Sequence, residues 1–393
     1  MNIAFFSDSY LPLVNGITSS LTLLNEQFGQ MGHQVTVFAP QVTNGWRDTA
    51  NVVRVKSIKI RENPPYYLTS LLSLYALNLV RQADFDVVHA HTPLSMGLLA
   101  YQAAYLLKRP LIYTYHTNVP EYLHYLGRLS KIKLVQKGAA QFDLMSCNLC
   151  NLIIAPSEKI KDILKTRGVS TPIEIVPNGI RWEKFVGNRQ GYLRCQFGIK
   201  QTDKILLAVG RLGAEKNLPF LLKVLIELRR KFEGVKLVIA GSGYLLANLR
   251  QLTTEFGISS DVIFLGNVPF ADMPALYADA DVFVSASTTE VHPMAVLEAI
   301  ASGLPVVAVN DKAFAETVID GKNGFLTPVN ETLFANKLLE ILGNPALQLN
   351  MSCESQRIGQ QFSIEKQASR LLTIYNTLTI NKPKHLGHAK VVT

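Results

Sequence analysis

Arginine and lysine stand five residues apart in the segment GRLGAEKN, residues 210–217. The segment follows an apolar run that predicts a strand, and it precedes a pattern that predicts a helix. A glycine turn between a strand and a helix N-terminus is a natural anion site, because unpaired backbone N–H groups point out of the helix start. Arg211 and Lys216 add two positive charges, so the segment predicts a diphosphate site that needs no metal ion. The alternative is a solvated loop with ordinary surface charges.

Two carboxylates, Glu290 and Glu298, form a second cluster after the apolar run VFVSAS. We expect Glu298 about one turn into a helix that begins near Pro293, with Glu290 just before that helix, so that both can face one ligand. An ionised carboxylate accepts two strong O–H hydrogen bonds, which suits sugar hydroxyls. The alternative is an acidic residue favoured by the helix dipole together with a glutamate on an amphipathic face.

Two further motifs resemble ligand sites but predict structural roles. Asp279 and Asp281 match the D-x-D pattern that binds a metal ion in other enzymes, but they lie in a helix-to-strand connection just before VFVSAS. We therefore predict no metal site. Gly241 and Gly243 follow an apolar run but lack the third glycine of a dinucleotide fingerprint. They predict a tight turn that leads into the pocket of the two charged clusters.

Cysteine and histidine pairs complete the set of reactive side chains. Cys147 and Cys150 form a single C-x-x-C in a segment with a helical pattern, without the second ligand pair of a zinc site. We predict reduced thiols on a helix. His89 and His91 alternate along a predicted strand, and we expect them on opposite faces, one packed and the other near the ligand.

Length and charge limit the class of protein. The chain has 393 residues, 48% of them hydrophobic, which suits two domains that each bury a core. No uninterrupted apolar run is long enough to predict a membrane-spanning helix, and no basic segment precedes the first predicted strand as in a signal peptide. We therefore expect a cytoplasmic protein. The net charge is +9, and residues 1–190 hold 19 Lys and Arg against 12 Asp and Glu, which indicates an anionic partner for that half.

Short apolar runs alternate with helical patterns along the whole chain, which predicts α/β domains with parallel sheets covered on both faces. The pattern restarts after about residue 200, so we predict two doubly wound, Rossmann-like domains facing across a cleft. The predicted ranges are residues 1–190 for an N-terminal domain and residues 191–362 for a C-terminal domain. Residues 363–393 would form a helix that crosses back to the first domain, followed by a basic tail. The predicted strands are residues 2–7, 34–39, 86–90, 111–115, 152–155, 174–176, 204–209, 235–240, 262–265, 282–285 and 306–309.

The order of the motifs along nearly the whole chain resembles retaining glycosyltransferase family four, whose fold is GT-B. Each motif is weak alone, and their joint order carries the resemblance. The matching segments are PLVNG at 12–16, DVVHAH at 86–91, YTYHT at 113–117, VPNG at 176–179, GRLGAEK at 210–216, EVHPMAVLEAIASGLP at 290–305 and ETVIDGKNG at 316–324.

The resemblance implies a role for each matching residue. Arg211 and Lys216 would bind the donor diphosphate and stabilise it as a leaving group. Glu298 would hold the ribose hydroxyls. Glu290 would hold the transferred sugar, together with backbone N–H groups of residues 292–294, that is His292, Pro293 and Met294.

Two residues of the N-terminal half would complete the site. Gly16 would let its loop approach the donor phosphates, which a Cβ would obstruct, and His116 would lie at the reacting centre. The family often has an aromatic residue and a glycine where this chain has His292 and Pro293, which leaves the identity of the sugar open. We expect UDP-glucose or UDP-galactose as donor, no cofactor and no required metal ion.

The sequence offers no nucleophile placed like that of a retaining hydrolase. We therefore expect front-face attack, in which the departing phosphate assists and Arg211 and Lys216 stabilise its growing charge. A sugar-nucleotide epimerase of the same architecture is the alternative from another class. A nucleic-acid partner is not expected, because aromatic and basic residues do not alternate on an obvious surface.

The acceptor is predicted from residues 128–142, RLSKIKLVQKGAAQF, where basic and apolar residues alternate. They could form a helix on an anionic membrane surface or an ordinary amphipathic helix that covers a core. The aromatic residues of YTYHT and of YLHY at 122–125 are similar to those of bacterial glucosyltransferases that act on diacylglycerol. This similarity favours a lipid acceptor and a peripheral position on the cytoplasmic face of the membrane. A polysaccharide precursor or another glycan, and small soluble acceptors, remain alternatives.

Overall fold

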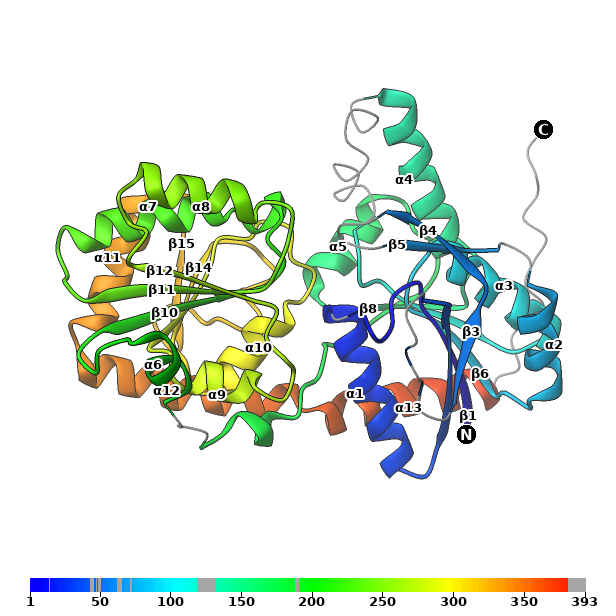
Figure 1. Cartoon of the computed structure of the whole chain (residues 1–393). Coiled ribbons are helices and arrows are strands. Elements are labelled where there is room, and N and C mark those ends of the chain that lie inside the picture. The colour runs from blue at the N-terminus through cyan, green and yellow to red at the C-terminus, as the bar shows by residue number, and fades with distance from the viewer. Residues whose placement is uncertain are drawn as a thin grey trace. The chain divides into compact units, whose positions relative to one another are not determined.

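The structure is a computed structural model. It describes residues 1–13, 15–42, 46, 48, 51–61, 66–70, 73–118, 132–187 and 191–380, and the statements below concern these residues. The chain divides into two compact units, one formed by Met1–Asn178 with Ile364–Thr393 and the other by Gly179–Ser363 (Figure 1). The first unit thus ends ahead of residue 190, where the sequence suggested a boundary, and the end of the chain belongs to it.

Unit 1 is built on a seven-stranded parallel sheet in the order β3-β2-β1-β6-β7-β8-β9. Strands β1, β6, β7 and β8 are almost entirely buried, which is why they appear in the sequence as unbroken apolar runs. The strands span Asn2–Phe6 (β1), Gln34–Pro40 (β2), Val52–Val55 (β3), Val87–Ala90 (β6), Leu111–Thr114 (β7), Leu152–Ala155 (β8) and Ile173–Ile175 (β9).

The helices of unit 1 include one from the far end of the sequence. Helix α13 packs against α1, so the chain returns to its first unit after completing the second (Figure 1). An antiparallel pair of short strands, β4 and β5, lies outside the main sheet. The bounds are Gly16–Gln30 (α1), Ser57–Arg61 (β4), Tyr66–Thr69 (β5), Leu74–Gln82 (α2), Ser95–Leu107 (α3), Lys133–Asn148 (α4), Glu158–Thr166 (α5) and Ile364–Ile380 (α13).

Unit 2 is built on a six-stranded parallel sheet in the order β12-β11-β10-β13-β14-β15. Chain connections run in opposite directions from β10, first to β11 and β12 and then to β13, β14 and β15. The carboxyl ends of β10 and β13 therefore flank the switch point where doubly wound sheets bind ligands. The strands span Lys204–Val209 (β10), Val235–Ala240 (β11), Val262–Gly266 (β12), Val282–Ser285 (β13), Val306–Val309 (β14) and Gly324–Thr327 (β15).

Helices cover both faces of this sheet, with α7 and α8 on one side and α9, α10 and α12 on the other (Figure 1). The face under α7 forms a continuous core in which Leu221 and Leu225 meet Leu237 of β11 and Leu338 of α11. This packing holds the loops at the strand ends in place. The helices span Tyr192–Phe197 (α6), Leu218–Arg229 (α7), Leu246–Glu255 (α8), Met273–Ala278 (α9), Met294–Ala301 (α10), Glu331–Leu342 (α11) and Pro345–Gly359 (α12).

The α/β class and the two Rossmann-like halves predicted from the sequence are confirmed. Strands β3, β4, β5 and β15 were not predicted. None of the described helices combines the length and apolar character needed to cross a bilayer. The predicted basic tail, residues 381–393, lies outside the described residues, as do residues 119–131, which include YLHY and the first part of the basic segment.

Candidate active site

The diphosphate segment predicted at residues 210–217 forms a tight connection from β10 to α7. Gly210 has a φ of +152°, and a short 3₁₀ turn, Ala214–Lys216, precedes the helix. Backbone hydrogen bonds tie this loop to the one after β11, from Leu212 N to Ser242 O at 2.9 Å and from Gly210 N to Ala240 O at 2.9 Å. The two predicted turns therefore support one another.

Gly241 is required at this contact between loops. Its φ is +135°, and a Cβ there would lie 1.9 Å from the backbone oxygen of Gly210. Gly243 is similar, since its Cβ would lie 2.4 Å from the oxygen of Leu212. The pair that resembled half a dinucleotide fingerprint thus allows two backbones to approach each other, which no side chain would permit.

Arg211 and Lys216 border one cavity at the ends of β10 and β13. Both cations have acidic neighbours. The guanidinium of Arg211 lies 3.4 Å from Glu215, and the ammonium of Lys216 forms an ion pair with Glu290. Ser287 donates a hydrogen bond to the backbone oxygen of Glu215 at 3.0 Å, which joins the end of β13 to the 3₁₀ turn.

The carboxylate of Glu290 is ionised in this surrounding. Burial acts to raise its pKa, but the Lys216 ammonium, a hydrogen bond from Ser287 and the Arg211 guanidinium together outweigh burial and hold the pKa below its usual value. The site therefore presents a charged hydrogen-bond acceptor next to two cations. An anionic ligand with hydroxyl groups fits this combination, because it can bind the cations and donate to the carboxylate at once.

Helix α10 begins where the sequence predicted, with Pro293 as its N-cap and Met294 as its first residue. One expectation is corrected here. Of residues 292–294 only His292 and Met294 can offer a backbone N–H, because proline has none. The imidazole of His292 is buried and packs against Phe362 with ring centroids 5.6 Å apart. Burial lowers its pKa to about 4, so the ring is neutral.

Glu298 lies one turn into α10, buried and at 7% exposure. Its Oε2 accepts a hydrogen bond of 2.8 Å from the hydroxyl of Tyr277, a residue of α9 that the sequence gave no reason to select. Burial raises the pKa of Glu298 to about 7, against the lowering effect of the Tyr277 hydrogen bond. Near neutral pH the side chain is therefore divided between its protonated and ionised forms, and such a shifted pKa is typical of functional sites.

Both carboxylates of the D-x-D pair have partners within unit 2. Asp279 accepts backbone hydrogen bonds from Gly191 and Leu193 at 3.1 and 2.6 Å. Asp281 forms ion pairs with Lys204, at 3.0 Å, and with Arg194, at 3.7 Å. Both carboxylates are thus engaged in holding the N-terminal part of unit 2 to its sheet. In the described part of the chain, no cluster of three or more potential metal ligands occurs.

Gly16 and His116 belong to unit 1 and follow the carboxyl ends of β1 and β7. Gly16 is the first residue of α1, whose N-cap Asn15 accepts a hydrogen bond from Thr18 N at 3.0 Å. The first N–H groups of such a helix have no partner within it and are open to an anion. His116 is half-buried, two residues beyond β7, and burial lowers its pKa to about 4.

The expectation that His89 and His91 lie on opposite faces of the sheet is wrong. Both rings are buried and in contact, with centroids 4.1 Å apart and planes tilted by 30°. Side chains alternate between faces with a period of two residues, so residues two apart share a face. His91 Nδ1 lies 3.1 Å from Nε2 of His116. The motif DVVHAH therefore supplies a direct neighbour of the predicted catalytic histidine.

Helix α4 contains the described part of the basic segment, and it projects from unit 1 (Figure 1). Only Asp143 and Cys147 of its side chains are buried. Leu134 is 79% exposed, and Ile132 just before the helix is 46% exposed. The first half of α4 therefore does not cover a core, in contrast to the amphipathic alternative considered from the sequence.

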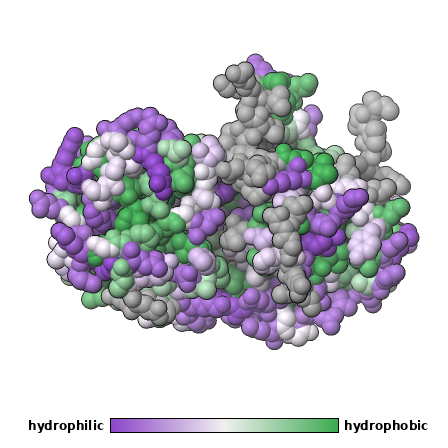
Figure 2. Space-filling model, in the orientation of Figure 1, coloured by the Kyte–Doolittle hydropathy of each residue, from purple (hydrophilic) through white to green (hydrophobic). Residues whose placement is uncertain are grey.

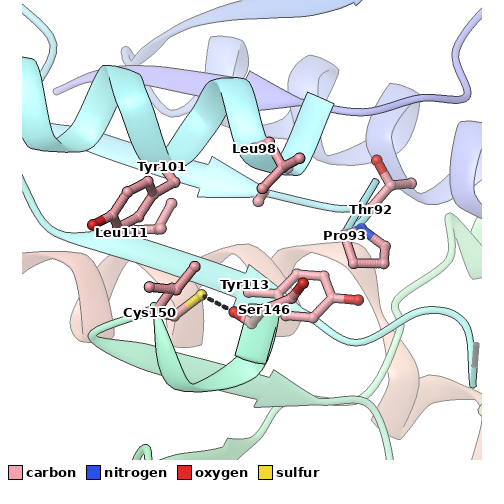
Figure 3. Close-up of a pocket in the computed structure, with 11 residues that line it drawn as sticks. Thr92, Pro93, Leu98, Tyr101, Leu111, Tyr113, Ser146 and Cys150 are labelled. Atoms are coloured by element: carbon pink, nitrogen blue, oxygen red, sulfur yellow. Dashed lines mark hydrogen bonds between the residues drawn. The ribbon is translucent and has the colours of Figure 1, made fainter. Parts of the chain in front are cut away.

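A second cavity lies in unit 1 between α3 and the end of α4, with Leu98 and Tyr101 on one side and Tyr113 and Cys150 on the other (Figure 3). None of the predicted site residues lines it. Cys147 and Cys150 are free thiols. Burial raises the pKa of the Cys150 thiol to about 12, and this thiol donates to the backbone oxygen of Ser146 at 3.3 Å, so it is unreactive at neutral pH.

Seven of the predicted site residues lie in unit 2, where ionic interactions join Arg211, Lys216 and Glu290 and the other four follow Glu290 on the loop and on α10. These residues are Arg211, Lys216, Glu290, His292, Pro293, Met294 and Glu298. Gly16 and His116 lie in unit 1. Sequence analysis missed Tyr277 and Glu215 in unit 2. It also missed the histidine pairing in unit 1, which the spacing of DVVHAH could have indicated.

Two family models match this chain. The model described as "Glycosyltransferase Family 4" matches residues 14–184, and the model "Glycosyl transferases group 1" matches residues 192–357. The chain is 30% identical to an alpha-monoglucosyldiacylglycerol synthase of Streptococcus pneumoniae over 87% of this chain and 78% of that protein. It is 28% identical to an alpha-monoglucosyldiacylglycerol synthase of Acholeplasma laidlawii over 98% of this chain and 100% of that protein.

The fold is also similar to a solved structure, that of HepE from Anabaena in complex with UDP and glucose. The TM-score is 0.76 with 21% sequence identity, over 96% of this chain and 100% of that one.

Proposed function

The chain belongs to glycosyltransferase family 4, and from that premise we propose that it transfers glucose from UDP-glucose to a hydroxyl group of diacylglycerol, with retention of configuration. The observation that carries the proposal is the pairing of Lys216 with Glu290, within electrostatic reach of Arg211, at the switch point of unit 2. Glu298 follows on the helix that begins after Glu290. Two cations for a diphosphate and two carboxylates for hydroxyl groups match a nucleotide-sugar. The names of the relatives support glucose and diacylglycerol.

Each part of the donor has a partner in this arrangement. Arg211 and Lys216 would bind the diphosphate, and Glu298 would accept hydrogen bonds from the ribose hydroxyls through Oε1, while Tyr277 holds Oε2. Glu290 would accept from the sugar hydroxyls. Backbone N–H groups at the start of α10 would complete the set in unit 2.

The ion pair of Lys216 and Glu290 suggests how binding leads to chemistry. Without donor, each group neutralises the other. The donor offers Lys216 an anionic phosphate and offers Glu290 a hydroxyl donor, so both groups exchange a protein partner for a substrate partner. Lys216 and Arg211 then stabilise the charge that grows on the leaving diphosphate. These fixed cations supply the role that a divalent metal ion has in other enzymes, so we propose that no metal is required.

Retention follows from attack on the face from which the diphosphate departs. The acceptor oxygen forms its bond to the anomeric carbon while the bond from that carbon to the phosphate oxygen breaks, and the acceptor proton passes to the departing phosphate. His116 would contact the sugar or the acceptor at this centre. Its pKa of about 4 keeps it neutral, so it binds by hydrogen bonding rather than by charge.

Helix α4 supports a lipid acceptor. It projects from unit 1 with Lys133 and Lys137 exposed beside Leu134, and Figure 2 shows green, hydrophobic side chains at this projecting part of the molecule. Each lysine near an anionic bilayer contributes about 1 kcal/mol, and a leucine that enters the bilayer contributes about 2 kcal/mol. We propose that α4 holds the protein on the membrane as a peripheral enzyme on the cytoplasmic face. No part of this proposal involves a nucleic acid.

Label transfer tests the donor and the acceptor together. Purified protein would be incubated with radiolabelled UDP-glucose or UDP-galactose and anionic vesicles with or without diacylglycerol, and the lipid phase would be extracted. Label from UDP-glucose in the lipid, dependent on diacylglycerol and absent in Glu290→Ala, supports the proposal. If only UDP-galactose labels the lipid, the donor is UDP-galactose and not UDP-glucose. UDP release without labelled lipid would overturn the lipid acceptor in favour of a polysaccharide precursor or a soluble acceptor.

A further inference from the structure

The described part of unit 1 contains a row of side chains that ends at His116. The hydroxyl of Tyr375, on α13, lies 2.6 Å from Nδ1 of His89, and Nε2 of His89 lies 2.7 Å from Oγ1 of Thr114. The ring of His89 packs against that of His91, and Nδ1 of His91 lies 3.1 Å from Nε2 of His116. Each side chain of the row therefore fixes the next one.

The three rings are neutral. Burial lowers the pKa of His116 to about 4 and that of His89 to about 3, and burial with the neighbouring imidazoles holds the pKa of His91 well below its usual value. In the described residues no carboxylate forms a hydrogen bond with any of the three. A neutral imidazole has one N–H and one lone pair. The contact between His91 and His116 therefore requires one ring to donate and the other to accept.

The surroundings of His91 determine which ring donates. Its Nε2 is buried and, among the described residues, has no hydrogen-bond partner. A proton on Nε2 would be an orphaned buried N–H group, which proteins avoid more strictly than an under-satisfied acceptor. The proton of His91 is therefore on Nδ1, and it is donated to Nε2 of His116. The proton of His116 is then on Nδ1, the nitrogen that no hydrogen bond engages in the described part of unit 1.

We propose that His91, steadied by His89 and Tyr375, is a positioning residue that holds His116 with its proton on Nδ1, so that His116 offers substrate a hydrogen-bond donor and not a base. This inference rests on the proposed place of His116 at the reacting centre. A hydrogen-bond donor at His116 suits front-face transfer, because the departing phosphate takes the proton of the acceptor hydroxyl and no protein base is needed. The C-terminal helix thereby acts on the site of unit 1 through Tyr375.

Nitrogen NMR of the ligand-free full chain, labelled in its histidines, tests the tautomer directly. The signals of His116 would be assigned with His116→Gln. We expect Nδ1 of His116 to carry the proton in the unaltered protein and in His91→Asn, whose amide N–H can donate in place of Nδ1. In His91→Asp the partner can only accept, so the proton of His116 should move to Nε2. A proton on Nε2 in the unaltered protein, or no change in His91→Asp, would overturn the inference.

Kinetics supply the second readout. We expect His91→Asn to retain activity within about threefold and His91→Asp to lower kcat about tenfold, the size of one hydrogen bond, with the KM for donor unchanged. Tyr115→Phe is the matched control. It removes a buried hydroxyl that donates to Asp143 at 2.7 Å in the same unit, so it should lower Tm and leave the His116 tautomer unchanged. Equal kcat in the two His91 variants would contradict the positioning role. The NMR measurement needs no turnover, so it tests the tautomer of His116 even if the protein does not transfer glucose to diacylglycerol.

Discussion

The ionisation of Glu298 predicts that donor binding strengthens as the pH rises through neutrality. Burial raises the pKa of this carboxyl to about 7. In the ionised form Oε1 can accept strong hydrogen bonds from the ribose hydroxyls while Oε2 accepts one from Tyr277. Protonation therefore competes with donor binding at pH values below the pKa. Three other residues should not contribute to this dependence, because the pKa values of His292 and His116 are about 4 and the pKa of Glu290 lies below its usual value.

The size of the effect follows from the pKa. With a value of about 7, about one tenth of Glu298 is ionised at pH 6 and about nine tenths at pH 8, so the Kd for donor should fall about tenfold over this interval. Tyr277 donates the hydrogen bond that lowers this pKa. Tyr277→Phe should therefore raise the pKa further and move the pH dependence to higher values.

Calorimetric titration with UDP-glucose at pH 6, 7 and 8 measures this dependence without an acceptor. UDP-glucose is preferable to UDP, because a terminal phosphate itself titrates near pH 6. Glu298→Gln should bind weakly and equally at all three values. A constant Kd in the unaltered protein would refute the assigned role of Glu298, as would a pH dependence that persists in Glu298→Gln.

Three further changes test the phosphate site, the loop contact and the membrane helix. Lys216→Ala should lower kcat at least about 100-fold, the usual cost of removing a group that stabilises transition-state charge, and a loss under about tenfold in initial-rate assays would contradict its role. Gly241→Ala should lower the free energy of unfolding, measured in urea, by about 2–4 kcal/mol, because the new Cβ would meet a backbone oxygen. Gly257→Ala is the control, since a Cβ there would have no other atom within 4 Å, and it should lower the free energy of unfolding by about 1 kcal/mol. Leu134→Glu should weaken binding to anionic vesicles about tenfold in a sedimentation assay. Leu349, a residue of unit 2 that is 65% exposed, provides the control, and Leu349→Glu should leave vesicle binding unchanged. Equal effects of the two substitutions would argue against α4 as the membrane contact.

Sequence patterns predicted much of the fold because most strands of both sheets are buried on both faces. Apolar runs such as those of β8 and β10 are easily distinguished in the sequence from the more polar loops on either side. Strands β3 and β4 escaped prediction because they are short and charged residues interrupt their apolar runs. Strand β15 begins with Gly324, whose missing side chain lets the backbone approach Val306 but weakens the strand pattern.

The parts of the candidate site that consist of residues close together in the sequence were predictable. The loop with Arg211 and Lys216 and the helix start before Glu298 both lie where the pattern placed them. Contacts between distant parts of the sequence were not predictable from one chain. The Tyr277 hydrogen bond that tunes Glu298 spans 21 positions, and the Tyr375 contact with His89 spans 286. Such pairs meet only once the sheet order and the return of α13 are known.

The configuration of the transferred sugar tests the central claim most directly. The product formed from UDP-glucose and diacylglycerol would be isolated from the lipid phase, and its anomeric proton coupling would be measured by NMR. The account predicts an α-linked monoglucosyl diacylglycerol, since the donor is α-linked and the attack is on the face that the diphosphate leaves. A β-linked product would contradict retention at this site, and the absence of any glucosylated lipid would contradict the assigned acceptor.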